Sequence, residues 1–252
     1  MKAVAQFVAA VSGLSFENVF NPYTDRCAVF DRPGAPVKRR EALRGILAAA
    51  ASGGTHSIWI GRDLGYRGGR RTGLALTDDV HVSSHAARWG IVTERCTKGM
   101  PVREKTAALA WSVLDEIDLP VFLWNVFPLH PHEPGVPFSN RPHRANERAA
   151  GEEMLADLLD LLHPELIVAL GGDAARCAER IAPRISVRVR HPSYGGQTEF
   201  LGQMSALYPT RPRKGRSDLF DVPLEGSPES ERTATEGRCS SVLRRAGGTS
   251  NR

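Results

Sequence analysis

Three polar residues that are far apart in the sequence each follow a short apolar run: Asp63, Asn125 and His191. An asparagine amide presents a donor beside an acceptor, so it can pair with a carbonyl and the neighbouring imide N–H of a pyrimidine. A histidine can donate to a developing oxyanion, and an aspartate can position water or stabilise nearby positive charge. These residue types therefore favour chemistry on a uracil-like base.

The segment that carries Asp63 is rich in glycine and arginine. Residues 61–73 read GRDLGYRGGRRTG, with five glycines and four arginines. Glycine lets backbone N–H groups approach a ligand closely, and arginine suits phosphate groups. We therefore expect a ligand in which such a base is joined to a phosphate backbone.

The elements that must position these residues alternate between helical and strand patterns. Helices are expected at residues 39–51, 103–117 and 144–162 and after a tight glycine turn at 171–172, and strands at 57–60, 120–127, 165–170 and 186–190. Strands separated by helices predict an α/β fold, a three-layer α/β/α sandwich with a central four-stranded parallel sheet. Ligands bind beyond the carboxyl ends of such strands, where Asp63, Asn125 and His191 should converge.

The composition is that of a folded globular chain, with 41% hydrophobic and 24% charged residues among 252. We expect one catalytic domain over residues 1–208. Residues 209–252 lose hydrophobic periodicity and carry nine basic against six acidic residues, which predicts a flexible basic tail. The net charge of +5 favours an anionic partner, although part of it belongs to this tail.

Several features bear on the compartment. The apolar start, MKAVAQFVAAVSGLSF, is short and mixed, so it predicts an amphipathic first helix rather than a signal peptide. No run reaches the roughly 18–20 apolar residues of a membrane span. The four cysteines, Cys27, Cys96, Cys177 and Cys239, are too far apart for a zinc knuckle or a dense disulfide framework. We therefore expect a cytoplasmic protein with reduced thiols and no membrane contact.

In its polar motifs the chain resembles the uracil-DNA glycosylase superfamily over about residues 55–207. Gly61-Arg62-Asp63 begins the match to the family's first motif, and Gly73-Leu74-Ala75-Leu76 follows at the family's spacing. Asn125 stands at the family's base-reading asparagine, and His191-Pro192-Ser193 matches its second catalytic motif. The cysteines lack the close pairs of the iron–sulfur branch, so we expect no cluster.

The resemblance implies a DNA repair glycosylase that flips uracil out of single- or double-stranded DNA and hydrolyses its N-glycosidic bond. The products would be free uracil and an abasic site. Asp63 would position water or stabilise the sugar cation, Asn125 would read the base, and His191 would stabilise the leaving uracil. No metal or organic cofactor is implied, and we expect a monomer.

The remaining expected site residues form two groups, one around the base and one along the DNA backbone. The group expected at the base is Gly61, Arg62, Gly65, Tyr66, Leu76 and Trp124, with Arg62 and the glycine loop supplying backbone donors. The group expected on the DNA is Arg67, Arg70, Arg71, Ser193, Tyr194 and Gly195. The arginines and Ser193 would contact phosphates, which position the enzyme without reading sequence.

Two positions in the expected pocket depart from the family's pattern. Gly65 stands where a tyrosine would exclude the methyl group of thymine, and Leu76 stands where a phenylalanine would stack on the base. Tyr66, Trp124 and Phe138 are candidate aromatic substitutes. We therefore expect discrimination between uracil and other bases to differ from the family's pattern.

A third departure concerns the DNA duplex. Gly195 stands where the family has a leucine that wedges between the strands. Tyr194 and Gln197 are candidate replacements for that wedge, and weak strand separation is the alternative.

Other interpretations of the same residues stay open. Asp63 can cap a turn or pair with Arg62 or Arg67, and Asn125 can satisfy loop backbone groups. A histidine before a proline, such as His191, can be structural. An acid, an amide and a basic loop would also suit a nucleotide or nucleotide-sugar hydrolase or transferase, and a basic surface alone would suit a non-catalytic nucleic-acid-binding module.

The pair His130 and His132, next to Glu133, suggests a metal site. Prolines on both sides indicate an extended loop, and a third ligand is not evident. We therefore expect these histidines to lie in a solvated loop and no metal to be bound.

Overall fold

The computed structural model describes residues 2–193 and 195–208 of the chain. In chain order its elements are α1 (Lys2–Gly13), β1 (Val19–Phe20), α2 (Ala35–Gly53), β2 (Ser57–Asp63), α3 (Gly69–Thr72), α4 (Val82–Arg88), α5 (Lys105–Leu114), β3 (Val121–Phe127), β4 (His130–Pro131), α6 (Ala145–Leu162), β5 (Leu166–Leu170), α7 (Gly172–Ile181), β6 (Ser186–Val189) and α8 (Gln197–Leu207). The tail expected at 209–252 lies outside the described residues.

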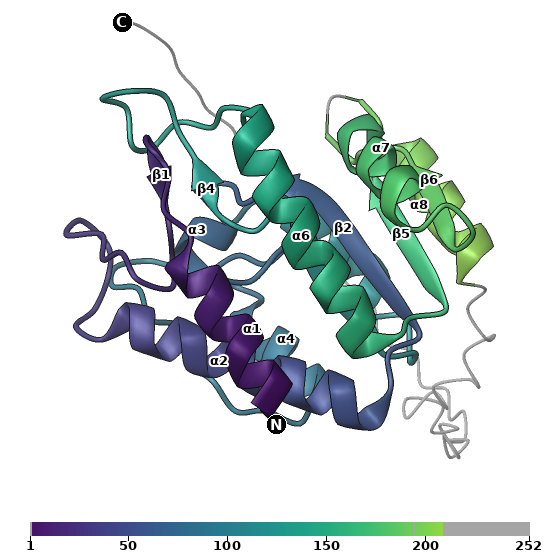
Figure 1. Ribbon diagram of the computed structural model, residues 1–252, viewed down its shortest axis with the longest axis horizontal. Helices are drawn as coiled ribbons and strands as arrows, with labels where there is room; N and C mark the ends of the chain where they lie inside the picture. The colour runs from purple at the N-terminus through teal and green to yellow at the C-terminus, as the bar shows by residue number, and fades with distance from the viewer. Residues whose placement is uncertain (1, 194, 209–252) are drawn as a thin grey trace, which may run out of the picture. The chain divides into compact units, whose positions relative to one another are not determined.

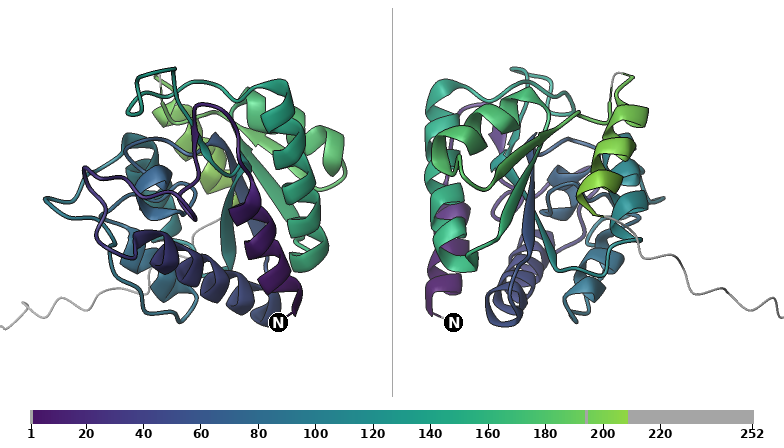
Figure 2. Two further views of the ribbon diagram at one scale, coloured as in Figure 1. Left: turned by 60° about the vertical axis from the view of Figure 1, so that its left-hand side comes forward. Right: turned by 90° about the vertical axis from the view of Figure 1, so that its right-hand side faces the viewer.

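The fold is built on a four-stranded sheet with the order β3-β2-β5-β6, in which every neighbouring pair is parallel. Helices α1, α2, α6 and α7 share a core with one face of the sheet, and α5 and α8 share a core with the other. Figure 1 shows α6 and α1 lying across the front of the sheet, and the right panel of Figure 2 shows the sheet between helices on both sides. The predicted three-layer sandwich is confirmed.

The strands bury side chains on both faces because each face is covered by helices. In β2, Ile58 and Ile60 belong to the core under α1, α2 and α6, whereas Trp59 belongs to the core under α5 and α8. This alternation follows the period of two along a strand. Tyr208, at the end of α8, closes the second core by bonding Ser57 Oγ at 2.6 Å and Trp59 Nε1 at 2.7 Å.

Several elements differ from the sequence-based expectation. Strand β2 continues three residues past Ile60 because it pairs with β3 as far as Asp63. Helix α5 begins at Lys105, which leaves Glu104 as its cap residue rather than inside the helix. Helix α8 and the short antiparallel ribbon of β1 and β4 carry no clear periodic signal and were not expected. The amphipathic first helix is confirmed as α1.

None of the helices in the described part of the chain is long and apolar enough to cross a membrane. Within the same residues, Cys27, Cys96 and Cys177 are buried free thiols.

Candidate active site

A pocket of about 460 Å³ opens at the carboxyl ends of the parallel strands. Asp63 ends β2, Asn125 lies near the end of β3, and His191 follows β6. All three side chains line this pocket, so the topology brings together residues that are more than 60 positions apart in the sequence. Its wall is made of Gly61, Arg62, Asp63, Leu64, Gly65, Gly69, Leu76, Glu104, Thr106, Asn125, Asn140, Arg141, Leu170, Gly171, Gly172, Asp173, His191 and Ser193.

Asn125 depends on the glycine beside it. Gly61 and Asn125 are register partners across β2 and β3. A Cβ on Gly61 would lie 2.5 Å from a terminal atom of the Asn125 side-chain amide, so only glycine leaves room for that amide. Assigned from its hydrogen bonds, the amide donates to Trp124 O at 3.1 Å and accepts from Leu64 N at 3.3 Å. Its second N–H and its remaining acceptor capacity are free for a ligand.

Asp63 is held on both carboxylate oxygens. Arg62 Nε donates to Oδ2 at 2.7 Å, and His143 Nδ1 donates to Oδ1. The second Arg62 contact runs from Nη1 to Asp173 Oδ2 at 3.1 Å. The ion pair with Arg62, which the sequence left open as an alternative for Asp63, is therefore present, and the carboxylate lines the pocket as well.

No sequence pattern indicated that His143 belongs to the site. It lies at the end of a proline-rich segment, residues 128–143, that has no helical or strand periodicity. The loop is fixed by Arg141, which donates to both Glu147 oxygens at 2.8 and 2.7 Å. Glu147 also accepts from the backbone N–H of Arg144 at 2.7 Å, which starts α6. The spacing of Arg144 and Glu147 is the one signal that marks this helix start.

His191 is set up as a neutral donor. Burial lowers its pKa, and the positive charges of Arg62 and Arg190 lower it further. The backbone N–H of Ser193 donates to His191 Nδ1 at 3.2 Å, so the ring proton lies on Nε2. Gly171 allows the close packing of this ring: its φ is +90°, and a Cβ there would lie 3.1 Å from the Cβ of His191.

The two departures from the family's pattern both lie in the pocket wall. Leu76 lines the pocket with a φ of +50°, a left-handed backbone conformation that is unfavourable for leucine. Gly65 lines the pocket too, and a Cβ there would meet no heavy atom within 4 Å. Neither position is crowded by an aromatic ring from the candidate substitutes.

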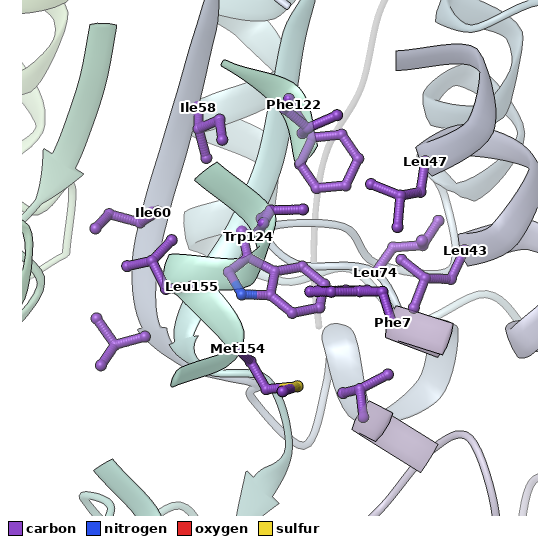
Figure 3. Packing of buried hydrophobic residues seen from close by; sticks show 14 of the residues in the cluster. Phe7, Leu43, Leu47, Ile58, Ile60, Leu74, Phe122, Trp124, Met154 and Leu155 are labelled. Atoms are coloured by element: carbon purple, nitrogen blue, oxygen red, sulfur yellow. The ribbon is translucent and has the colours of Figure 1, made fainter. Parts of the chain in front are cut away.

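Trp124 does not contact the pocket, and the expectation that it binds the base is wrong. Because successive side chains along a strand point to opposite faces of the sheet, the side chain of Trp124 points to the opposite face from that of Asn125. It is 2% exposed and packs against Phe7, with ring centroids 5.4 Å apart. Figure 3 shows it among Phe7, Leu74 and Met154 in the core.

Arg70 and Arg71 were expected on DNA phosphates, and this expectation is wrong as well. The two residues are 4% and 7% exposed. Arg70 stacks over the ring of Phe20 and bonds His130 Nδ1 at 2.9 Å, while Arg71 forms an ion pair with Asp79 at 2.7 Å. They bury their charge in the protein and hold the loop that follows β2.

The other aromatic candidates also lie outside the pocket wall. Tyr66 receives a hydrogen bond from Arg67 Nε at 2.8 Å, and the guanidinium of Arg67 lies over its ring. Phe138 packs near Arg70 and against Phe30. Arg67 is exposed, and its expected contact with a phosphate stays a prediction.

The segment after His191 is only partly in the pocket. Ser193 lines it and its hydroxyl bonds Thr106 Oγ1 at 3.1 Å. Gly195 is exposed, with a φ of +77°, and does not line the pocket. Tyr194 lies outside the described residues.

His130 does not lie in a solvated loop as expected. It is fully buried between Arg70 Nη1 and the carbonyl of Ser139, and burial, with the charge of Arg70, lowers its pKa to about 3. Across residues 2–193 and 195–208, no group of three or more metal-ligating side chains is gathered.

Glu104 is a pocket residue that the sequence did not reveal, because it reads as an ordinary acidic residue at a helix start. Its side chain lines the same pocket as Asn125. Burial raises its pKa, with the hydroxyl of Thr106 acting in the opposite direction.

Comparison with known proteins relates the chain to a protein family and to solved structures. The family model of the uracil DNA glycosylase superfamily matches residues 58–216, more than half of the chain. The crystal structure of wild-type Pedobacter heparinus SMUG2 is similar in fold, with a TM-score of 0.55 and 14% sequence identity over 81% of this chain and 96% of that chain. No curated protein matches the sequence.

Proposed function

Because the chain belongs to the uracil DNA glycosylase superfamily, we propose that it excises uracil from DNA by hydrolysing the N-glycosidic bond, leaving an abasic site. One observation carries this proposal: Asp63, Asn125 and His191 line a single pocket at the carboxyl end of the sheet. A binding module without catalysis has no need for this acid, amide and imidazole together. A nucleobase must leave the base stack to enter such a pocket, at a cost of a few kcal/mol.

Asn125 reads the base. Its free N–H donates to O4 of uracil and its oxygen accepts from N3–H. Cytosine presents the opposite arrangement at these atoms, so it would leave the buried amide unpaired at a penalty of about 1–3 kcal/mol. The hydrogen bonds to Trp124 O and Leu64 N support this role because they fix the plane of the amide before the base arrives.

His191 and Asp63 act on the two charges that develop as the glycosidic bond breaks. The Nε2–H of neutral His191 donates to O2 of the leaving uracil as negative charge grows there. Asp63 stabilises the positive charge on the sugar and positions the water that attacks C1′. The water forms a bond from its oxygen to C1′ and keeps one hydrogen as the new hydroxyl, and its other proton passes through solvent to the departing uracil anion. No step requires a metal or an organic cofactor.

The DNA backbone follows the rim of the pocket. With Arg70 and Arg71 buried, phosphate binding falls to exposed arginines: Arg67 and, near Gly172 at the start of α7, Arg176 and Arg188. Guanidinium groups suit phosphates because they donate in a fixed fork. Ser193 joins them at the pocket wall. We place the protein in the cytoplasm as a monomer that acts on single- or double-stranded DNA.

The test uses a labelled oligonucleotide with a single uracil, incubated with the protein in chelator and then treated with alkali. We expect cleavage at the uracil with the wild type and with Asp160→Asn, an exposed carboxylate on α6. Asp63→Asn is expected to raise the activation free energy by several kcal/mol, which lowers the excision rate about 10³-fold. Intact uracil in both single and double strands with the wild type would refute the proposed function.

A further inference from the structure

Asn140 is a pocket residue that the proposed reaction leaves without a role. It lies in the loop between β4 and α6 and lines the pocket. Its side-chain oxygen accepts hydrogen bonds from the backbone N–H of Tyr66 at 3.0 Å and from Nε2 of His130 at 3.3 Å. Among the residues that the structure describes, Nδ2 of this amide has no hydrogen-bond partner. Asn140 therefore brings two N–H donors to the pocket wall that are not used within the fold.

A buried pair of side chains fixes which way this amide faces. Arg70 is always protonated, so its Nη1 donates to His130 Nδ1 at 2.9 Å. Burial and the charge of Arg70 lower the pKa of His130 to about 3, so the ring is neutral and its one proton lies on Nε2. This N–H donates to the carbonyl of Ser139 at 2.8 Å and to the amide oxygen of Asn140. A flipped amide would place its NH2 group against two donors, so the oxygen stays on the protein side.

The position of Asn140 in the pocket indicates which part of the substrate its donors meet. His143, three residues further along the same loop, donates to Asp63 Oδ1, so this loop forms the wall on the Asp63 side. In the proposed reaction Asp63 faces the sugar, whereas Asn125 and His191 bind the base. The donors of Asn140 therefore face the sugar–phosphate backbone, where the non-bridging phosphate oxygens are the strong acceptors.

The neighbours of Asn140 suit a phosphate as well. Asparagine side chains are among the common hydrogen-bond donors to DNA phosphates. Tyr66 joins Asn140 to an exposed guanidinium, because its backbone N–H donates to the amide and its hydroxyl accepts from Arg67 Nε at 2.8 Å. An amide and a positive charge held by one residue make a rim that can bind an anion.

Resting on the proposed function, we propose that Asn140 is a DNA-binding residue whose Nδ2 donates to a phosphate next to the flipped uridine. A phosphate is the same beside every base, so the contact adds affinity without reading the base. Asn140 takes no part in bond breaking.

The experiment measures the Kd of single-stranded oligonucleotides that carry one 2′-fluoro-2′-deoxyuridine, because the fluorine disfavours the sugar cation and prevents hydrolysis during the measurement. In a matched series, each phosphate near that nucleotide is replaced singly by an uncharged methylphosphonate. At one position we expect the replacement to raise the Kd of the wild type about tenfold, the effect of one hydrogen bond to a charged acceptor. In Asn140→Ala the same replacement should have a much smaller effect, because the contact is already lost.

Asn140→Asp separates the donor from the anchor of the loop. A carboxylate keeps an acceptor for the N–H groups of Tyr66 and His130, but it replaces both donors by an oxygen that repels a phosphate. We expect Asn140→Asp to raise the Kd of the unmodified oligonucleotide at least as much as Asn140→Ala does. The matched control is Gln6→Glu, the same change from amide to acid at an exposed position of α1, which should keep the wild-type Kd.

Three results would overturn the proposal. A wild-type Kd for Asn140→Asp would show that the side chain only anchors the loop. Methylphosphonate effects that are equal in the wild type and Asn140→Ala at every position would show that the amide contacts no phosphate. A lost preference for uracil over cytosine in Asn140→Ala would place the amide against the base.

Excision from an unmodified uracil oligonucleotide, measured on the same preparations, reports on the proposed function separately. If the wild type still releases uracil, any of these three results leaves the function standing. A wild type that binds the oligonucleotides but releases no uracil overturns the function, and this proposal with it, because a flipped uridine is its premise.

Discussion

Replacing His143 with alanine tests whether the pocket needs a firmly held carboxylate. Asp63 has two charged or polar donors, Arg62 on one oxygen and His143 on the other, and its side chain is 7% exposed. Water therefore cannot fully replace a donor that is removed. A hydrogen bond to a charged group contributes about 1.5–3 kcal/mol, so His143→Ala should slow the chemical step roughly 10- to 150-fold.

The assay is single-turnover excision of uracil at saturating enzyme, with the oligonucleotide's Kd measured separately. Because His143 touches Asp63 and does not line the pocket, the rate is expected to fall while DNA affinity stays unchanged. His143→Asn keeps an N–H near the position of Nδ1 and should recover much of the rate. His132→Ala, in the same loop, is the control. A folded His143→Ala protein with the wild-type rate would refute this reasoning.

Three further predictions follow from the same structure. First, burial lowers the pKa of His85 and His130 to about 3, so below pH 6.5 the unfolded chain binds more protons than the folded chain. The free energy of unfolding should therefore fall as the pH drops from 6.5 toward 3. Urea unfolding at several pH values measures this. Stability that stays flat over this range would contradict it. Second, Gly61→Ala should displace Asn125 and lower the excision rate about 10²-fold. Gly65→Ala should leave the rate near the wild-type level, because a Cβ at Gly65 would have no heavy atom within 4 Å. Equal rates in the two variants would argue against the packing described. Third, Arg176→Ala should weaken binding to DNA of any sequence and reduce the slope of log affinity against log salt concentration by about one. An unchanged slope would show that Arg176 does not contact a phosphate.

The sheet and its two helical layers could be predicted from sequence because buried parallel strands and amphipathic helices leave periodic patterns. The convergence of Asp63, Asn125 and His191 could be predicted for the same reason, since each follows a strand and parallel strands end at one edge. The order of the strands in the sheet could not be predicted, because the apolar sequence of a buried strand does not specify which strand it pairs with. Helix α8 was missed because it is short and only Phe200 and Met204 of its side chains are buried, which leaves a weak helical pattern in the sequence.

The errors in the site have a common physical cause. Arg70 and Arg71 resemble a phosphate-binding run in the sequence, and only the fold places Phe20, Phe30 and Asp79 where they bury and neutralise these side chains. Sequence reports which charges exist and not which of them face solvent. His143 and Glu104 were missed for the converse reason, because a loop histidine and a helix-capping glutamate are ordinary until the fold brings them to the pocket.

The most direct test of the central claim is to analyse the products from DNA that contains one uracil, in chelator and ¹⁸O-labelled water. Free uracil should appear in equal amount to abasic sites, with the label on the sugar, for the wild type and for the control Asn146→Ala, and both products should be lost with Asn125→Ala. Cleavage of a phosphodiester bond without uracil release, or the same yield from Asn125→Ala, would contradict the account.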